Sequence, residues 1–372
     1  MSKSLLILFS TVLLFACDEV LLKDDDGISI EQNLSIPESL GDGWDVSSPG
    51  REGADSAALF RLIRDLQSDS RHIHGLLIVK NNKLIVESYF DGWHRNRFQS
   101  MRSASKSIAS TMVGIAIDKG FIAGIDQSVL DFFPEYADLR TADKDKIQLQ
   151  HVLSMTAGLH WDQDMFPPED PRNDEYQLEE SDDGFRYLLE KNVVSAPGKN
   201  FRYNSGCSDL LLGIVDHAAK IPADKFAEDY LFKPLGIESY GWRKNNNGYP
   251  NGGYGLHMYP RDIMKVGQMF LDSGKWKGNQ IVSSSWVKQA TSEYISLDDG
   301  VGYGFQWWIW NEKIGERIVR RYQAQGKGGQ IICVVPEFNA VIVMTGANFD
   351  NYYSQIPYAI LRNRILPALS SD

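Results

Sequence analysis

Residues 101–120 read MRSASKSIASTMVGIAIDKG. From Ser103 to Lys119 the pattern is helical and apolar nearly all round, and Gly120 follows it. A helix that is apolar on every side belongs in the interior of a protein. The stretch therefore predicts a buried helix over residues 103–119.

The first turn of this helix carries Ser103 and Lys106, whose types and spacing suit nucleophilic catalysis. A serine hydroxyl needs a base within hydrogen-bond reach, and residues i and i+3 share a helix face. Burial lowers the pKa of a lysine toward the range where it takes up a proton. The free N–H groups of a helix N-terminus also favour negative charge beside Ser103. The alternative is that Ser103 is only an N-cap and that Lys106 is solvated.

The Ser-x-x-Lys spacing occurs a second time, from Ser285 to Lys288. No apolar helix follows this second pair, so we expect it to begin a helix at the surface. Chance alone produces about one or two such matches in a chain of this length, so the first pair needs support from other residues.

One such residue is Tyr203, in the loop 197–205 that precedes a predicted helix over 209–219. A tyrosine at a corner between loop and helix can relay protons when a lysine lowers its pKa. The alternative is a tyrosine of the hydrophobic core, which is the commoner fate of this residue type.

A second supporting stretch is QGKGGQ, residues 325–330. Glycines such as Gly326 and Gly328 let a substrate approach the backbone closely, and an N–H group near Lys327 could bind an oxyanion. The alternative is a hairpin turn whose glycines adopt positive φ.

Periodicity around these motifs predicts an α/β (α+β) fold. Strands are expected at both ends of the chain, and a mostly helical block lies between them. Such strands join in one antiparallel sheet, flanked by N- and C-terminal helices, with the helical block as a large insertion. The expected strands are 73–79, 84–90, 303–310, 317–324, 330–335 and 340–345; the expected helices are 55–68, 147–155, 184–191, 209–219, 223–232, 260–273 and 353–366, with a long exposed acidic loop over 161–183.

The N-terminus has the pattern of a secretory signal. Lys3 precedes an apolar run from Leu5 to Ala16, which is too short to span a bilayer. The run ends Leu14-Phe15-Ala16-Cys17, which resembles a bacterial lipobox, so we expect lipidation at Cys17. The protein would then be anchored to a membrane of the bacterial cell envelope. The alternative is a plain signal peptide that happens to contain a cysteine.

The expected organisation follows from these features. Residues 1–17 are a signal peptide, and residues 18–50, poor in aromatic side chains, are a flexible tether. Residues 51–372 form one catalytic unit. Within this unit, 51–124 and 296–372 build the α/β part and 125–295 the helical part.

Composition excludes several classes of protein. The 372 residues are 43% hydrophobic, which is ordinary for a globular protein, and the net charge of −11 argues against nucleic-acid binding. Three cysteines cannot build a disulfide framework, and we expect Cys207 and Cys333 to be small buried hydrophobes. His72-x-His74 has no third ligand nearby, so we expect no metal. We expect no organic cofactor either.

Three motifs together resemble those of the serine β-lactamase-like hydrolases: MRSASKS at 101–107, Tyr203-Asn204-Ser205, and the glycine-rich strand edge at 326–329. That superfamily includes class C β-lactamases, DD-peptidases, family VIII esterases and 6-aminohexanoate-dimer hydrolases. The segments HVLSMTAGL (151–159), GLHMYPRD (255–262) and GYGFQWW (302–308) strengthen the resemblance, which covers about 55–370.

The resemblance implies a β-lactamase/transpeptidase-like fold and a serine hydrolase that works through an acyl-enzyme. Ser103 would be the nucleophile, Lys106 its base, and Tyr203 the relay to the leaving group. The N–H groups of Ser103 and of a residue near Lys327 would form the oxyanion hole. The set of residues expected to bind oxyanion or substrate is Ser103, Ser205, Gly326, Lys327 and Gly328.

Two departures from the family pattern narrow the expected substrate. The second motif usually ends in asparagine, but here its third residue is Ser205. The third motif of β-lactamases is Lys-Thr-Gly, whereas Ala324-Gln325-Gly326 has no cation in the first position. We therefore expect a small ester or amide as substrate rather than a β-lactam. The alternatives are a cell-wall peptidase for D-amino-acid peptides and a non-catalytic envelope binding protein on the same scaffold.

Overall fold

The architecture is built on a large, mostly antiparallel sheet. The computed structural model describes residues 34–298, 300–350 and 354–370. The sheet has the order β1-β3-β2-β14-β13-β12-β11-β10-β9, and every pair is antiparallel except β1 with β3. Its strands are β1 (Asp45–Val46), β2 (Ile73–Lys80), β3 (Lys83–Tyr89), β9 (Ile295–Asp298), β10 (Val301–Tyr303), β11 (Trp308–Ile314), β12 (Arg317–Gly326), β13 (Gln330–Val335) and β14 (Ala340–Gly346).

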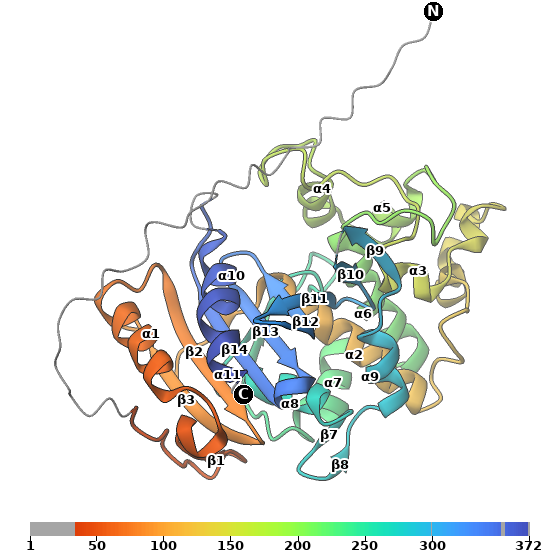
Figure 1. Ribbon diagram of the computed structural model, residues 1–372. Helices are drawn as coiled ribbons and strands as arrows, with labels where there is room; N and C mark the ends of the chain where they lie inside the picture. Colours follow the sequence, from red (N-terminus) through yellow and green to blue (C-terminus); the bar gives the residue numbers. More distant parts are fainter. Residues whose placement is uncertain (1–33, 299, 351–353, 371–372) are drawn as a thin grey trace, which may run out of the picture. The chain divides into compact units, whose positions relative to one another are not determined.

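Strands from the two ends of the chain meet in this sheet, as the sequence predicts, because β14 pairs with β2. One face is covered by α1 (Ser56–Ser68) and by the C-terminal helices α10 (Ile356–Ile360) and α11 (Leu366–Leu369), which the π-helical turn Leu361–Ile365 joins (Figure 1). Asp55 caps α1 by accepting the N–H of Ala58 at 2.9 Å, and α1 packs its apolar side on the core of that face. The N-terminal and C-terminal helices thus flank the sheet as expected.

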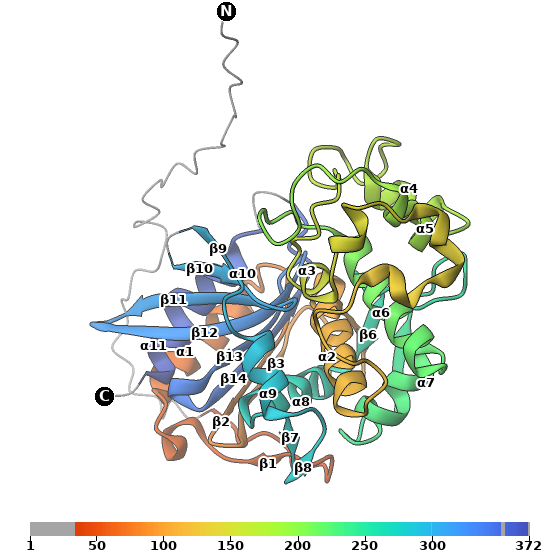
Figure 2. The same ribbon diagram turned by 90° about the vertical axis from the view of Figure 1, so that its right-hand side faces the viewer.

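The other face of the sheet is covered by α8 (Pro260–Leu271), which contacts β2, β13 and β14. The helical part lies beyond it, where α2 (Ser105–Asp118) packs against α6 (Ser205–Ala219) (Figure 2). The other α-helices are α3 (Leu149–Leu153), α4 (Asp174–Glu180), α5 (Gly184–Glu190), α7 (Ala223–Ala227), extended by a π-helical turn Glu228–Phe232, and α9 (Ser284–Ala290). α8 therefore packs on the sheet of the α/β part, although the sequence analysis assigned its stretch, 125–295, to the helical part.

The remaining elements are short. Two small sheets are formed by β4 (Gln99–Ser100), β6 (Leu256–Met258) and β5 (Tyr240–Trp242), and by β7 (Lys275–Trp276) with β8 (Asn279–Gln280). The 3-10 turns are Pro49–Glu52, Arg102–Ala104, Val129–Phe132, Pro134–Leu139, Lys144–Lys146 and Pro336–Phe338.

The buried helix predicted over 103–119 is present. It begins with the 3-10 turn Arg102–Ala104 and continues as α2, in which every residue from Ser105 to Ala116 is buried. The second Ser-x-x-Lys pair is exposed on α9, where Ser283 is the N-cap. Cys207 and Cys333 are buried free cysteines, as predicted.

Several expectations about local structure are wrong. The strand predicted over 303–310 is broken between β10 and β11, where Gln306 has a φ of 64°. The acidic stretch 161–183 contains α4, for which Asn173 provides the N-cap. The C-terminal helix is present, but it is described from Ile356 and runs on to Leu369, beyond the predicted end, and it contains the π-helical turn Leu361–Ile365.

Residues 34–50, assigned to the tether, instead lie against the fold. Trp44 is buried, and β1 pairs with β3. The buried Arg261 donates to Asp42 Oδ2 at 2.8 Å and to the carbonyl oxygen of Glu38. Polar composition hid this segment because many of its contacts are polar, although Trp44, Val46 and Leu34 also pack against the core. The signal peptide, Cys17 and the tether residues 18–33 lie outside the described residues, so the anchor stays a prediction.

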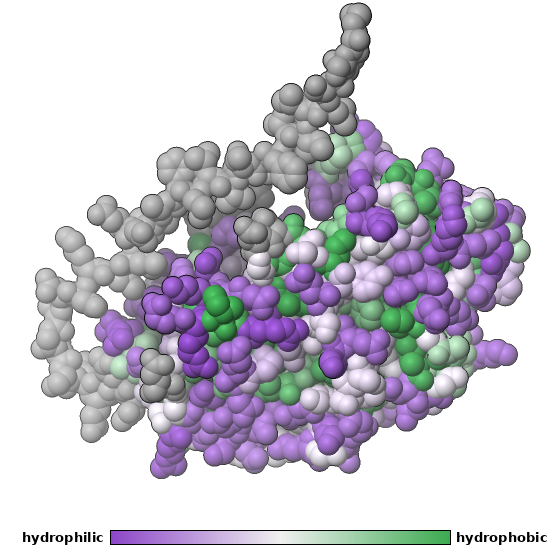
Figure 3. Space-filling view, turned by 45° about the vertical axis from the view of Figure 1, so that its right-hand side comes forward, coloured by the Kyte–Doolittle hydropathy of each residue, from purple (hydrophilic) through white to green (hydrophobic). Residues whose placement is uncertain are grey.

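The visible surface of the described part is mostly hydrophilic, with small scattered hydrophobic patches (Figure 3). No helix among the described residues is long and apolar enough to cross a membrane.

Candidate active site

Ser103 lies in the 3-10 turn that leads into α2 and lines a cavity of about 540 Å³. The turn is anchored to β6, because Met101 donates its N–H to the carbonyl oxygen of Leu256 at 2.8 Å. Arg102, directly before the serine, has a φ of 49°, in the left-handed region that non-glycine residues rarely occupy. Such strain is typical of functional sites, where the surroundings fix an otherwise unfavourable backbone.

The Lys106 side chain is buried, with 1% of its surface exposed, and reaches Ser103 from the first turn of α2. Its Nζ lies 3.3 Å from Ser103 Oγ, 3.1 Å from Ser205 Oγ and 2.7 Å from the carbonyl oxygen of Gly253. These three partners are uncharged, and no carboxylate of the described residues forms an ion pair with Lys106. The alternative in which Lys106 is solvated is therefore wrong.

Tyr203 also lines the cavity, and its contact with Lys106 is through the ring. Lys106 Nζ lies 5.0 Å from the ring centroid of Tyr203, and the ring centroids of Tyr203 and Trp308 are 6.1 Å apart. Within the described part of the chain, no residue hydrogen-bonds the Tyr203 hydroxyl. The structure thus brings the three predicted catalytic residues together and leaves this hydroxyl available to a substrate.

Ser205 occupies the third position of the second motif, which usually holds asparagine. It begins α6, while Asn204 serves as the N-cap by accepting the N–H of Cys207 at 3.2 Å. The Ser205 Oγ accepts from Lys106, so a hydroxyl provides the polar contact at this place.

Gly326 ends β12 directly against the serine turn. A Cβ atom added there would lie 2.4 Å from the Met101 carbonyl oxygen and 3.0 Å from the Ser103 nitrogen, so only glycine fits. Lys327 follows it and lines the cavity. Gly328 does not line the cavity: it bridges to Asn348, and a Cβ atom on it would meet the ring of Phe349. The structure therefore brings Gly326 and Lys327 to the site and leaves Gly328 out of it.

Two backbone N–H groups beside the serine hydroxyl are available to bind an oxyanion. Among the described residues, none accepts from the N–H of Ser103 or of Lys327. Ser103 lies in the serine turn and Lys327 directly follows β12, and these two elements lie in contact. The Ser103 N–H was predicted for the oxyanion hole, and the Lys327 N–H is one candidate for the second donor, which was predicted only as an N–H near Lys327.

The loop 251–255 contributes to the site and was missed by the sequence analysis. Tyr254 donates its N–H to Asn251 Oδ1 at 2.8 Å, and this N–H belongs to the same peptide group as the Gly253 carbonyl that Lys106 contacts. A Cβ atom on Gly252 would lie 2.4 Å from the Ser208 carbonyl oxygen, so the loop approaches α6 closely. The closely spaced glycines of NGGYG (251–255) were the feature of the sequence that could have indicated this loop.

Asp209 is the buried carboxyl behind this loop. It accepts from the N–H of Gly253 at 3.0 Å and lies 3.5 Å from Asn251 Nδ2. Burial raises the pKa of Asp209 to about 7, although the Gly253 N–H and the charge of Lys106 act in the opposite direction. A neutral or half-ionised Asp209 therefore supports the loop that holds Lys106.

This shifted pKa makes folding stability depend on pH. Between about pH 4, the ordinary aspartate pKa, and about pH 7, the folded chain keeps a proton that the unfolded chain has released. Stability contributed by Asp209 falls as the pH rises through this window. Asp209→Asn removes the titration, so we expect the variant to lose less stability than the parent between about pH 5 and pH 8 in urea unfolding. The exposed Asp143→Asn is the control, and identical pH slopes for parent and Asp209→Asn would contradict the assignment.

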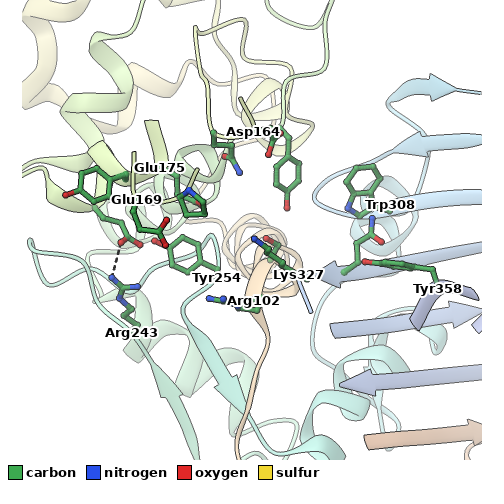
Figure 4. A pocket seen from close by; sticks show the side chains of 17 residues that line it. Arg102, Asp164, Glu169, Glu175, Arg243, Tyr254, Trp308, Lys327 and Tyr358 are labelled. Carbon is green, nitrogen blue, oxygen red and sulfur yellow. Dashed lines mark hydrogen bonds and ion pairs between the residues drawn. The ribbon is translucent and has the colours of Figure 1, made fainter. Parts of the chain in front are cut away.

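One side of the cavity is mostly acidic, although Arg243 pairs with Glu179 there, and the side of the serine turn is basic (Figure 4). Asp164, Glu169 and Glu175 come from the stretch 161–183, and burial together with Glu175 raises the pKa of Asp164. Arg102 and Lys327 lie on the side of the serine turn. On the sheet side the cavity is bounded by Trp308 and Tyr358, also labelled in Figure 4.

The described residues hold no group of three or more histidine, cysteine, aspartate and glutamate side chains that could bind a metal ion. His74, which the sequence analysis considered as a ligand, stacks on Trp93 with ring centroids 3.9 Å apart.

Similarity to known proteins extends over most of the chain. A family model described as Beta-lactamase matches residues 59–353. The 6-aminohexanoate-dimer hydrolase of Paenarthrobacter ureafaciens is 25% identical over 292 residues, covering 72% of this chain and 70% of that protein. Among solved structures, a candidate 6-aminohexanoate-dimer hydrolase from Bacillus anthracis has a TM-score of 0.69 at 20% identity, covering 82% of this chain and 81% of its own. EstCE1, a hydrolase with promiscuous acyltransferase activity, has a TM-score of 0.67 at 16% identity, covering 82% and 98%.

Proposed function

Because the chain belongs to the beta-lactamase family and has its fold, we propose that it is a serine hydrolase that cleaves a small ester or amide through an acyl-enzyme. The observation that supports this most strongly is the buried Lys106 Nζ, 3.3 Å from Ser103 Oγ at the wall of an open cavity. A lysine in that place has a partner to deprotonate and a substrate space beside it.

In the proposed reaction, Lys106 in its neutral form accepts the proton of Ser103 as the serine oxygen attacks the scissile carbonyl carbon. The negative charge that develops on the carbonyl oxygen is bound by the N–H groups of Ser103 and Lys327. The Tyr203 hydroxyl passes a proton to the leaving alcohol or amine and is reprotonated from Lys106. Water then attacks the acyl-enzyme, the same groups return the protons, and the acid is released.

The charges of the cavity support an amide with charged ends as one substrate class. The acidic wall of Asp164, Glu169 and Glu175 suits an ammonium group, and Arg102 with Lys327 suits a carboxylate. A linear amide of two ω-amino acids carries both groups, and the relative from Paenarthrobacter ureafaciens is named for a 6-aminohexanoate dimer. An amidase of this type is our second candidate beside a simple esterase.

A substrate panel tests the proposed function. Short-chain p-nitrophenyl esters, a linear 6-aminohexanoate dimer, a D-alanyl-D-alanine peptide and nitrocefin are offered to the parent and to Ser103→Ala. We expect turnover of esters or of the dimer, lost in the variant. Turnover of the D-peptide alone would instead identify a cell-wall peptidase, and no turnover of any compound would favour a binding protein.

We expect Tyr203→Phe to slow acylation by about 10²-fold, since general acid–base catalysis contributes about 10² to 10⁴ and Lys106 stays in place. Stopped-flow burst kinetics with an activated ester measure the acylation rate separately from deacylation. Tyr230→Phe, on a half-buried tyrosine outside the cavity, is the matched control. An unchanged burst rate in Tyr203→Phe would show that this hydroxyl relays no proton.

A further inference from the structure

A line of polar side chains runs along the same side of β12 toward the cavity. Arg321, Gln323 and Gln325 alternate along the strand, and Arg321 and Gln323 are buried. Arg321 Nε donates to Glu312 Oε2 of β11 at 2.8 Å, and Arg321 Nη1 donates to Gln323 Oε1. Gln323 Nε2 in turn donates to Gln325 Oε1 at 2.9 Å. We name these four residues the β12 relay.

The chemistry of arginine fixes the direction of every amide in the β12 relay. A guanidinium has only donors, so it must meet the oxygen of Gln323 and not its nitrogen. The nitrogen of Gln323 is then directed to Gln325 and meets the oxygen there. The amide nitrogen of Gln325 is the last donor in this series of hydrogen bonds. No described residue accepts a hydrogen bond from it.

Gln325 lies where two cavities meet. It lines the catalytic cavity, and together with Tyr358 it also lines a neighbouring cavity of about 680 Å³. The second cavity contains Trp310, on whose ring Arg321 packs at 4.3 Å from the centroid. A substrate group that extends from Ser103 to the wall shared by the two cavities lies beside Gln325.

We propose that Gln325 selects substrates with a hydrogen-bond acceptor oxygen on the part that lies between the two cavities, and that Glu312, Arg321 and Gln323 hold its amide with the N–H groups toward the substrate. The acceptor is a carbonyl or carboxylate oxygen. This inference rests on the proposed hydrolase function and adds a recognition element to it. Gln325 is a specificity residue that contacts substrate, and the other three are positioning residues.

Two variants test the direction of the amide. Gln325→Glu replaces the N–H donor by an oxygen. Gln323→Glu leaves Gln325 in place but offers it an acceptor, so that the Gln325 amide must turn and present its oxygen to the cavity. Arg321 and Arg362 both contact Glu312, so cations are at hand for the added carboxylate.

The readout is a ratio of kcat/KM values between esters. The probes are p-nitrophenyl hexanoate, keto analogues with the ketone moved along the acyl chain, and dimethylammonium analogues that carry only a donor. We expect the parent to prefer the best keto ester over the unsubstituted ester. Both variants should reduce this preference about tenfold and shift it toward the dimethylammonium esters.

Gln355→Glu makes the same change on the rim of the second cavity but outside the β12 relay, so it is the matched control. Thermal melting verifies that each variant folds. If Gln323→Glu does not fold, the ester preference of Gln325→Glu, at a half-buried position, tests the proposal alone. The proposal would be overturned if the folded variants kept the preference of the parent enzyme. Their ratio of kcat/KM for the best keto ester to kcat/KM for the unsubstituted ester would then lie within twofold of the ratio in the parent enzyme. Failure of the hydrolase function looks different, because the parent would then cleave none of the esters.

Discussion

Ser103→Ala is expected to lower ester turnover by at least about 10⁴-fold while the protein stays folded, because loss of the nucleophile in a serine hydrolase leaves only binding and oxyanion contacts. Ser103 is half-buried at the wall of the cavity, and its Oγ contacts only Lys106 among the described residues. The change to alanine therefore removes one hydrogen bond and creates no large void. Steady-state turnover and thermal melting measure the two effects separately.

The second Ser-x-x-Lys pair offers a matched control for this variant. Ser285 is exposed on α9 and stands in the same spacing to Lys288 as Ser103 does to Lys106. Ser285→Ala should keep parental turnover. Full activity in Ser103→Ala would disprove the assignment of the nucleophile, whatever the control shows.

Lys106→Met is expected to lower turnover by at least about 10³-fold, because the base beside Ser103 is lost while an unbranched side chain only one atom shorter fills the space. Methionine cannot donate to Ser205 Oγ or to the Gly253 carbonyl, so these groups lose a partner. We expect a destabilisation of about 1 to 3 kcal/mol from the unsatisfied carbonyl. Turnover and urea unfolding are measured on the same preparation.

Lys288→Met, on the exposed face of α9, is the control for the general effect of removing a lysine. If Lys106→Met stayed folded and retained turnover within tenfold of the parent, another group would have to be the base. The folding measurement excludes the simpler explanation that the variant is inactive because it is unfolded.

Much of the fold follows from patterns that act over short distances. The all-apolar stretch 103–119 predicted the buried helix, and the strand patterns at 317–324, 330–335 and 340–345 predicted β12, β13 and β14. Ser103 and Lys106 were predicted together because one helical turn fixes their separation. Tyr203 was a candidate from its place between a loop and a helix, with a core tyrosine as the alternative, and only the resemblance to a family motif assigned it the role of relay.

The parts that the sequence did not reveal depend on contacts between distant segments. Asp209 and the loop 251–255 support Lys106 through hydrogen bonds to backbone atoms, which leave little trace in residue type. The contact of Arg321 with Glu312 in the β12 relay depends on the register of β11 with β12, which periodicity does not specify. The packing of residues 34–50 was missed for the same reason, since Arg261 holds them from far along the chain.

The central claim is that Lys106 activates Ser103 as a nucleophile. Labelling residues 18–372 with a fluorophosphonate, followed by intact mass and peptide mapping, tests it most directly. The predicted result is a single adduct on Ser103, formed rapidly in the parent and lost or greatly slowed in Lys106→Met. No adduct on Ser103 in a protein that melts cooperatively, or an adduct formed equally fast in Lys106→Met, would contradict it.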